Sequence, residues 1–170
     1  MRRYDEVGLN RRRPRGLEIV AIELTDKGVD DAALTGALLD QVSDPIASFT
    51  ADGAYDQDRV HEAVAERHPD AAVIVPPRSS ATLSASAETA PTRRDQHILE
   101  IAGHGRMGWQ KSSGYNIRAK VEAAIGRYKR VIGDALRSRT DKTEATEVAI
   151  AATAMNRMLG LGRPNYVRIG

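Results

Sequence analysis

The sequence predicts an α/β domain in which a small β-sheet is covered by helices. Short apolar runs that are typical of strands alternate with segments whose apolar residues recur at helical spacing. Two long helical segments close the sequence, at 115–133 and 143–159. The 170 residues are enough for one domain with a substantial core.

The expected elements follow one another along the chain. Residues 1–16 are rich in arginine and lack an apolar period, so they are predicted to form a tail or loop without a strand. Strands are predicted at 17–24, 46–51 and 71–75, the last being stopped by Pro76 and Pro77. Helices are predicted at 29–42, 56–67, 96–102, 115–133 and 143–159. Gly160, Gly162 and Pro164 are expected to end the last helix.

Composition excludes several classes of protein. Cysteine is absent, so there is no disulfide framework and no thiolate metal site, which fits a reducing cytoplasm. No apolar run is long enough to span a membrane, and the arginine-rich start is not followed by the apolar stretch of a signal peptide. The net charge of +2 and the pI near 9.0 say little about nucleic acid by themselves.

One helical segment carries four polar residues on a single stripe. They fit the spacing Y-x-x-R-x-x-x-E-x-x-x-x-x-x-K and lie within about 60° of one another on a helical wheel: Tyr115, Arg118, Glu122 and Lys129. A carboxylate beside an arginine and a lysine can hold a metal ion and bind phosphate. A second carboxylate, Asp52, follows the second predicted strand. Together these residues predict phosphoryl-transfer chemistry on nucleic acid.

These residues resemble a known family. The stripe, together with Asp52-Gly53-Ala54-Tyr55, is similar to the C-terminal part of the catalytic domain of DDE transposases from bacterial insertion sequences, in the IS-four/IS-five group. Segments 105–115 and 155–158 also resemble that family, and the resemblance runs from about residue 17 to residue 164. The four-residue helix motif is specific, whereas D-G-A-Y alone is weak.

The resemblance implies an RNase H-like fold and a metal-dependent polynucleotidyl transferase that cleaves and joins DNA. Asp52 and Glu122 would be two of three acids that hold Mg²⁺ or Mn²⁺. Arg118 and Lys129 would neutralise phosphate charge, and Tyr115 would contact phosphate or support the carboxylates. The partner would be DNA, both at the ends of the element and at the target.

Further DNA contacts are expected from three other residues of the same region. Arg127 and Arg130 belong to a basic helix that suits a phosphate backbone. Trp109, the only tryptophan, can stack on a flipped base near the cut end. Its alternative role is to anchor a loop in the core.

The sequence departs from the family in its first part. An RNase H-like fold has five strands and carries its first catalytic aspartate on the first of them, but only the last three strands are recognisable here. We therefore expect residues 17–164 to form a partial catalytic domain that is inactive alone, flanked by a tail or loop at 1–16 and a tail at 165–170. The missing strands would leave open sheet edges, which favour pairing with another chain and hence a homo-oligomer.

Two other interpretations stay open at this point. The chain can be a non-catalytic DNA-binding remnant that acts through its basic helix and arginine-rich start. It can also be a small α/β interaction protein in which the polar stripe is only structural. In that case Arg118 and Glu122 form an ordinary i,i+4 pair worth roughly 0.2–0.5 kcal/mol.

Overall fold

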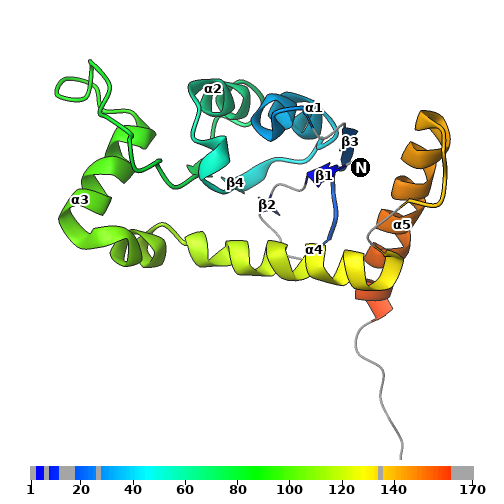
Figure 1. Cartoon of the computed structure of the whole chain (residues 1–170). Coiled ribbons are helices and arrows are strands. Elements are labelled where there is room, and N and C mark those ends of the chain that lie inside the picture. The colour runs from blue at the N-terminus through cyan, green and yellow to red at the C-terminus, as the bar shows by residue number, and fades with distance from the viewer. Residues whose placement is uncertain (1–2, 6–7, 12–17, 26–27, 134–135, 162–170) are drawn as a thin grey trace, which may run out of the picture.

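The computed structural model of the chain describes residues 3–5, 8–11, 18–25, 28–133 and 136–161 (Figure 1). The strands are β1 (Arg3–Asp5), β2 (Gly8–Arg11), β3 (Glu23–Thr25), β4 (Ile46–Thr50) and β5 (Ala72–Ile74). The α-helices are α1 (Thr35–Asp40), α2 (Asp58–Arg67), α3 (Arg93–Ser112), α4 (Arg118–Ile132) and α5 (Asp141–Leu161). Short 3-10 helices are η1 (Asp31–Leu34), η2 (Gly53–Tyr55) and η3 (Tyr115–Ile117). The predicted mixed α/β class is confirmed.

Strand β4 is the centre of the larger sheet. It pairs in parallel with β5 on one side and antiparallel with β2 on the other, in the order β2-β4-β5. The connection from β4 to β5 passes through α2, as a parallel pair requires. Strands β1 and β3 form a separate antiparallel pair. Because β4 and β5 run in the same direction, the turns that follow them meet at one edge of the sheet.

The expectation that no strand precedes residue 17 is wrong. Both β1 and β2 lie there, and β2 occupies the side of β4 that was expected to be open. The segment has no apolar period because such short strands are defined by their partners rather than by their own residues. Within the predicted strand at 17–24, only its last two residues belong to β3, and 18–22 run without ladder pairing.

Helices α1 and α2 cover one side of the β2-β4-β5 sheet, whereas α4 runs along the other side (Figure 1). The core beneath α1 and α2 is built around Phe49 of β4, which is completely buried. Val60 and Val64 of α2 pack against it, one helical turn apart. Asp30 caps η1 by accepting a hydrogen bond from the Ala32 N–H.

Helix α3 is much longer than the predicted 96–102. Its start is fixed by a capping box in which the Thr92 and Asp95 side chains each bond the other's backbone N–H. Inside the helix, Gly105 has a φ of 72°, a conformation that favours glycine, and the helix is kinked there. The kink breaks the apolar period, which is why the sequence pattern stopped short.

The two long C-terminal helices occur as predicted and pack against each other near the end of α4. Tyr128 is buried against Ala151 and Met155 of α5, and Ile19 joins this cluster. The Asn156 side chain holds the backbone of Ile19 at both ends: its amide donates to the Ile19 carbonyl at 2.7 Å and its oxygen accepts from the Ile19 N–H at 2.8 Å. Helix α5 continues through Gly160, and the other two residues expected to end it lie outside the described part.

Candidate functional site

The first part of the site is the turn after β4. Asp52 follows the carboxyl end of this buried strand and starts η2 with an extended backbone. One oxygen of its carboxylate, Oδ1, accepts a hydrogen bond from the Ala54 N–H at 2.9 Å. Tyr55 is buried in the core with its ring edge against Phe49, at 6.2 Å between ring centroids. The turn is therefore anchored at Tyr55, while the second oxygen of Asp52 is left for other partners.

Arg118, the first residue of α4, joins the two predicted acids. Its Nη2 lies 3.2 Å from Asp52 Oδ2 and 3.5 Å from Glu122 Oε1. The two carboxylates, which come from elements far apart in the sequence, are thus no further apart than the sum of these distances. The Arg118 side chain is 20% exposed, whereas those of Asp52 and Glu122 are 46% and 63% exposed. One cationic nitrogen therefore bridges two acids that solvent can reach.

Tyr115 lies beside this group, just before α4. Burial raises the pKa of its hydroxyl, and the charge of Arg118 offsets this only in part. The hydroxyl is therefore neutral near pH 7 and able to donate a hydrogen bond. The ring of Tyr115 contacts Trp109 at 5.2 Å between centroids, and Trp109 also contacts His97 at 5.4 Å between centroids.

The expectation that Trp109 stacks on a base is not supported. Its side chain is completely buried and contacts the rings of His97 and Tyr115, so it has no surface to offer to DNA. Trp109 instead anchors the end of α3 against the start of α4, which was the alternative considered from the sequence. A lone tryptophan has no spacing that distinguishes these two roles.

The other basic residues of α4 lie at different places around the helix. Lys129 is exposed on the same stripe as Arg118 and Glu122, about two turns after Glu122 and three turns after Arg118. Arg127 lies about half a turn away from Arg118 around the axis, and Arg130 about a third of a turn. Arg127 is partly buried, and its Nε and Nη2 have no hydrogen-bond partner among the described residues. Only Lys129 of these three therefore shares the stripe of the two acids.

A further acidic residue, Asp56, supports the turn after β4 and was not predicted from the sequence. Asp56 is buried, and its carboxylate is held by Arg94 of α3 through Nε at 2.6 Å and Nη2 at 3.1 Å. The N–H of Arg78, which follows β5, donates to the same carboxylate at 2.9 Å. These contacts span 22 and 38 residues, so no local spacing could have revealed them. The only sequence signal is that Asp56 directly follows the D-G-A-Y segment.

Comparison with known proteins agrees with the acid-containing turn and the polar stripe. A family model described as Transposase DDE domain matches residues 13–157, which is most of the chain and includes both Asp52 and Glu122. The chain belongs to the DDE transposase family. No solved structure matches it. Among its described helices, none is both long and apolar enough to cross a bilayer.

The acids of this transposase domain fit part of a metal site. Asp52 and Glu122 offer hard oxygen ligands that Mg²⁺ prefers, and their exposure leaves room for the water molecules it retains. The Arg118 guanidinium between them indicates that the position suits a positive charge. Within the described ranges, however, no group of three or more histidine, aspartate or glutamate side chains is placed to hold a metal. The pair therefore fits one ion, and a second ion needs a further ligand.

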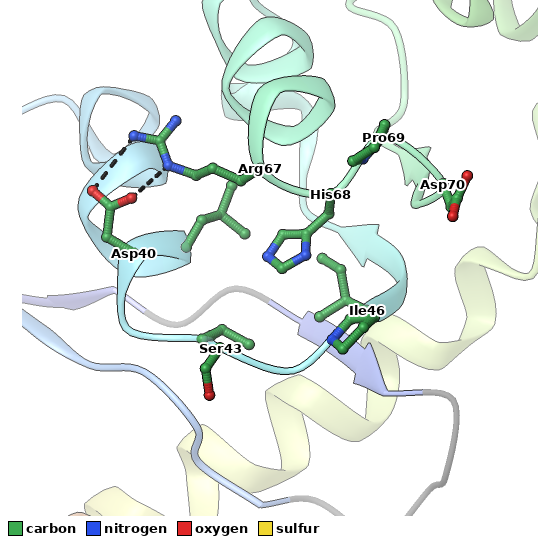
Figure 2. A pocket seen from close by; sticks show the side chains of 10 residues that line it. Asp40, Ser43, Ile46, Arg67, His68, Pro69 and Asp70 are labelled. Carbon is green, nitrogen blue, oxygen red and sulfur yellow. Dashed lines mark hydrogen bonds and ion pairs between the residues drawn. The ribbon is translucent and has the colours of Figure 1, made fainter.

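A pocket of about 440 Å³ lies at the other end of β4 in the transposase domain (Figure 2). It is lined by residues that include Ile46, the first residue of β4, and His68, which follows α2. Its Arg67 and Asp40 are paired with each other, at 2.6 Å between Nε and Oδ1. The pocket is therefore separate from the acids at the carboxyl end of β4.

The buried ion pair beneath the turn predicts a pH-dependent stability. Burial raises the pKa of Asp56, but hydrogen bonds from the Arg94 side chain and the Arg78 N–H outweigh it and hold the pKa below its ordinary value of 3.8. The ionised carboxylate therefore stabilises the fold above that pH, and this contribution is lost as the pH falls through the lowered pKa. We expect Asp56→Asn to lower the free energy of unfolding at pH 7 by about 3–5 kcal/mol.

The measurement is denaturant unfolding of both proteins between pH 7 and pH 3. The difference between wild type and Asp56→Asn should narrow below the ordinary pKa of the carboxyl group. The matched control is Asp40→Asn, which breaks the exposed pair with Arg67 and should cost far less. Equal losses in the two variants would contradict a special role for the buried pair.

Proposed function

We propose that this chain is a DNA transposase domain that binds DNA phosphates beside a divalent cation held by Asp52 and Glu122. The proposal extends the transposase family assignment to named residues of this chain. The observation that carries it is the bridge from Arg118 to both carboxylates, because it brings the two acids and a phosphate-binding cation to one place. The cation would be Mg²⁺ or Mn²⁺. When bound, such ions activate the attacking hydroxyl group and stabilise the leaving oxygen.

The side chains of the site have distinct roles in this proposal. Arg118 is the residue that can bind two phosphate oxygens at once through its planar guanidinium. Lys129 adds a point charge further along the same stripe, where the DNA backbone would continue. Tyr115, protonated near neutral pH, donates a hydrogen bond to a phosphate or a carboxylate. Arg127 and Arg130 provide additional positive charge outside the stripe.

The domain is proposed to be the C-terminal part of an RNase H-like catalytic domain, of the IS-four/IS-five group of bacterial insertion sequences. The Y-x-x-R-x-x-x-E-x-x-x-x-x-x-K spacing supports the group, and the parallel β4–β5 pair with Asp52 at its carboxyl edge is consistent with that fold. We place it in the cytoplasm, where its DNA lies. Association with a further copy is part of the proposal, because a third acid has to reach the pair.

A second candidate function is DNA binding without catalysis. It is favoured because the site has only two acids among the described residues, and phosphate binding by Arg118 and Lys129 does not need a complete metal cluster. Both candidate functions include DNA binding, but only the first includes DNA cleavage, so binding and cleavage are tested separately.

DNA binding should be weak, largely independent of sequence and dependent on the stripe. Replacing Arg118, Arg127, Lys129 and Arg130 together by alanine should weaken binding strongly. Within that set, Arg118→Ala with Lys129→Ala should lower the slope of log K against log salt by about two, one for each phosphate contact. The measurement is fluorescence anisotropy with duplex DNA at several salt concentrations.

The matched control removes the same charge elsewhere, with Arg59→Ala and Arg67→Ala. Both of these arginines are paired with acids on the α1–α2 side, and their loss should leave the slope nearly unchanged. An equal decrease of the salt slope in both double variants would show that DNA binding depends on net charge alone and not on the polar stripe of α4.

Cleavage by this chain alone is not expected. Two carboxylates hold one ion loosely, and paired-metal chemistry needs a third ligand. The test mixes the purified chain, Mg²⁺ or Mn²⁺, and a DNA fragment that carries the ends of the insertion sequence. We expect no nicked or joined product. Nicking that disappears in Glu122→Gln would mean that the site is completed without a partner, and the prediction would be wrong.

A further inference from the structure

The orientation of the Asp52 carboxylate depends on a turn that has little stability of its own. Oδ1 is turned toward the Ala54 N–H, and this leaves Oδ2 directed to Arg118. A 3-10 turn of three residues has weak hydrogen bonds. If the turn opened, Oδ2 would no longer be held beside Glu122, so something outside the turn has to keep it closed.

Arg78 is placed to do this. Its Nε donates to the Gly53 carbonyl at 3.2 Å and its Nη2 to the Ala54 carbonyl at 3.1 Å. Two consecutive carbonyls of the turn are thus bound by one guanidinium, whose fork geometry suits such a pair. If either carbonyl rotates away from the guanidinium, its hydrogen bond to Arg78 is lost.

Arg78 is itself held at its backbone, so it is a fixed support. Its N–H donates to the buried Asp56 carboxylate, which Arg94 also binds. The two prolines before it, Pro76 and Pro77, are buried, and the Pro77 carbonyl accepts a hydrogen bond from Arg106 of α3 at 3.0 Å. The segment after β5 is therefore hydrogen-bonded both to α3 and to the turn at Gly53 and Ala54.

We propose that Arg78 is a positioning residue of the transposase site: it binds the Gly53 and Ala54 carbonyls and so orients the Asp52 carboxylate toward Arg118 and Glu122. The inference rests on the proposed function only for the role given to Asp52. Arg78 acts through the turn, because its side-chain hydrogen bonds go to the backbone carbonyls of Gly53 and Ala54. Sequence reasoning missed it because its partners lie 24 and 25 residues away.

The test follows the amide hydrogen that reports on the Asp52 carboxylate. The Ala54 N–H donates to Asp52 Oδ1, so its exchange with water, measured by NMR, increases when the turn opens. In Arg78→Met we expect this exchange to become about tenfold faster, while the thermal midpoint and the exchange of core amides in β4 change little. Arg78→Lys, which keeps the charge but not the fork, should give an intermediate rate.

Two controls make the result specific. Asp52→Ala, which removes the acceptor, should also increase Ala54 exchange, which verifies that this amide reports on the Asp52 side chain. Arg67→Met, which removes an arginine from the Asp40 pair at the other end of β4, should leave Ala54 exchange unchanged.

Unchanged Ala54 exchange in a folded Arg78→Met protein would overturn the inference. If that variant did not fold, the folded Arg78→Lys protein would decide in the same way. The exchange measurement uses neither metal nor DNA. The proposed function would fail if DNA binding did not depend on Arg118 and Lys129, and that result is independent of Ala54 exchange.

Discussion

The arrangement of the site depends on one shared ion pair, in which the Arg118 guanidinium lies between the carboxylates of Asp52 and Glu122. Helix α4 is joined to the Asp52 turn through this contact at its first residue, and to α5 through buried Tyr128 near its other end. Val131, in the last turn of α4, is 48% exposed, so the apolar packing of α4 is partial. The ion pair with Asp52 is therefore the contact that joins the start of α4 to the turn after β4.

An exposed ion pair is a weak and exchangeable contact, worth about 0–1 kcal/mol in most proteins. That property suits a site whose acids have to change partners, since a metal ion or a phosphate competes for the same groups. The ion pair between Asp56 and Arg94, which supports the turn after β4, is buried and not readily exchanged. Arg94 binds the Asp56 carboxylate through two nitrogens, and the Asp56 side chain is only 1% exposed. The site thus combines a rigid turn with a loosely held cation.

The sequence predicted the parts of this arrangement that depend on local spacing. Asp52 follows an apolar strand, and the spacing of Arg118 and Glu122 on one helix makes them neighbours whatever the helix packs against. The parts that depend on pairing at a distance were missed or misjudged. Strand β2 has no apolar pattern and exists through its partner β4, and Arg78 and Arg94 reach Asp56 across long intervals. Trp109 was predicted to contact DNA. Its burial depends on contacts with His97 and Tyr115, which its own sequence position does not reveal.

The most direct test of the central claim is the binding of Mn²⁺, followed by electron paramagnetic resonance of the free ion. We expect one site in the wild-type chain, lost in Asp52→Asn and in Glu122→Gln, while Glu62→Gln, which neutralises an exposed acid on α2, keeps it. Loss in both site variants would establish that the acids joined by Arg118 form a single cation site. Mn²⁺ binding that is equal in all four proteins would contradict the account.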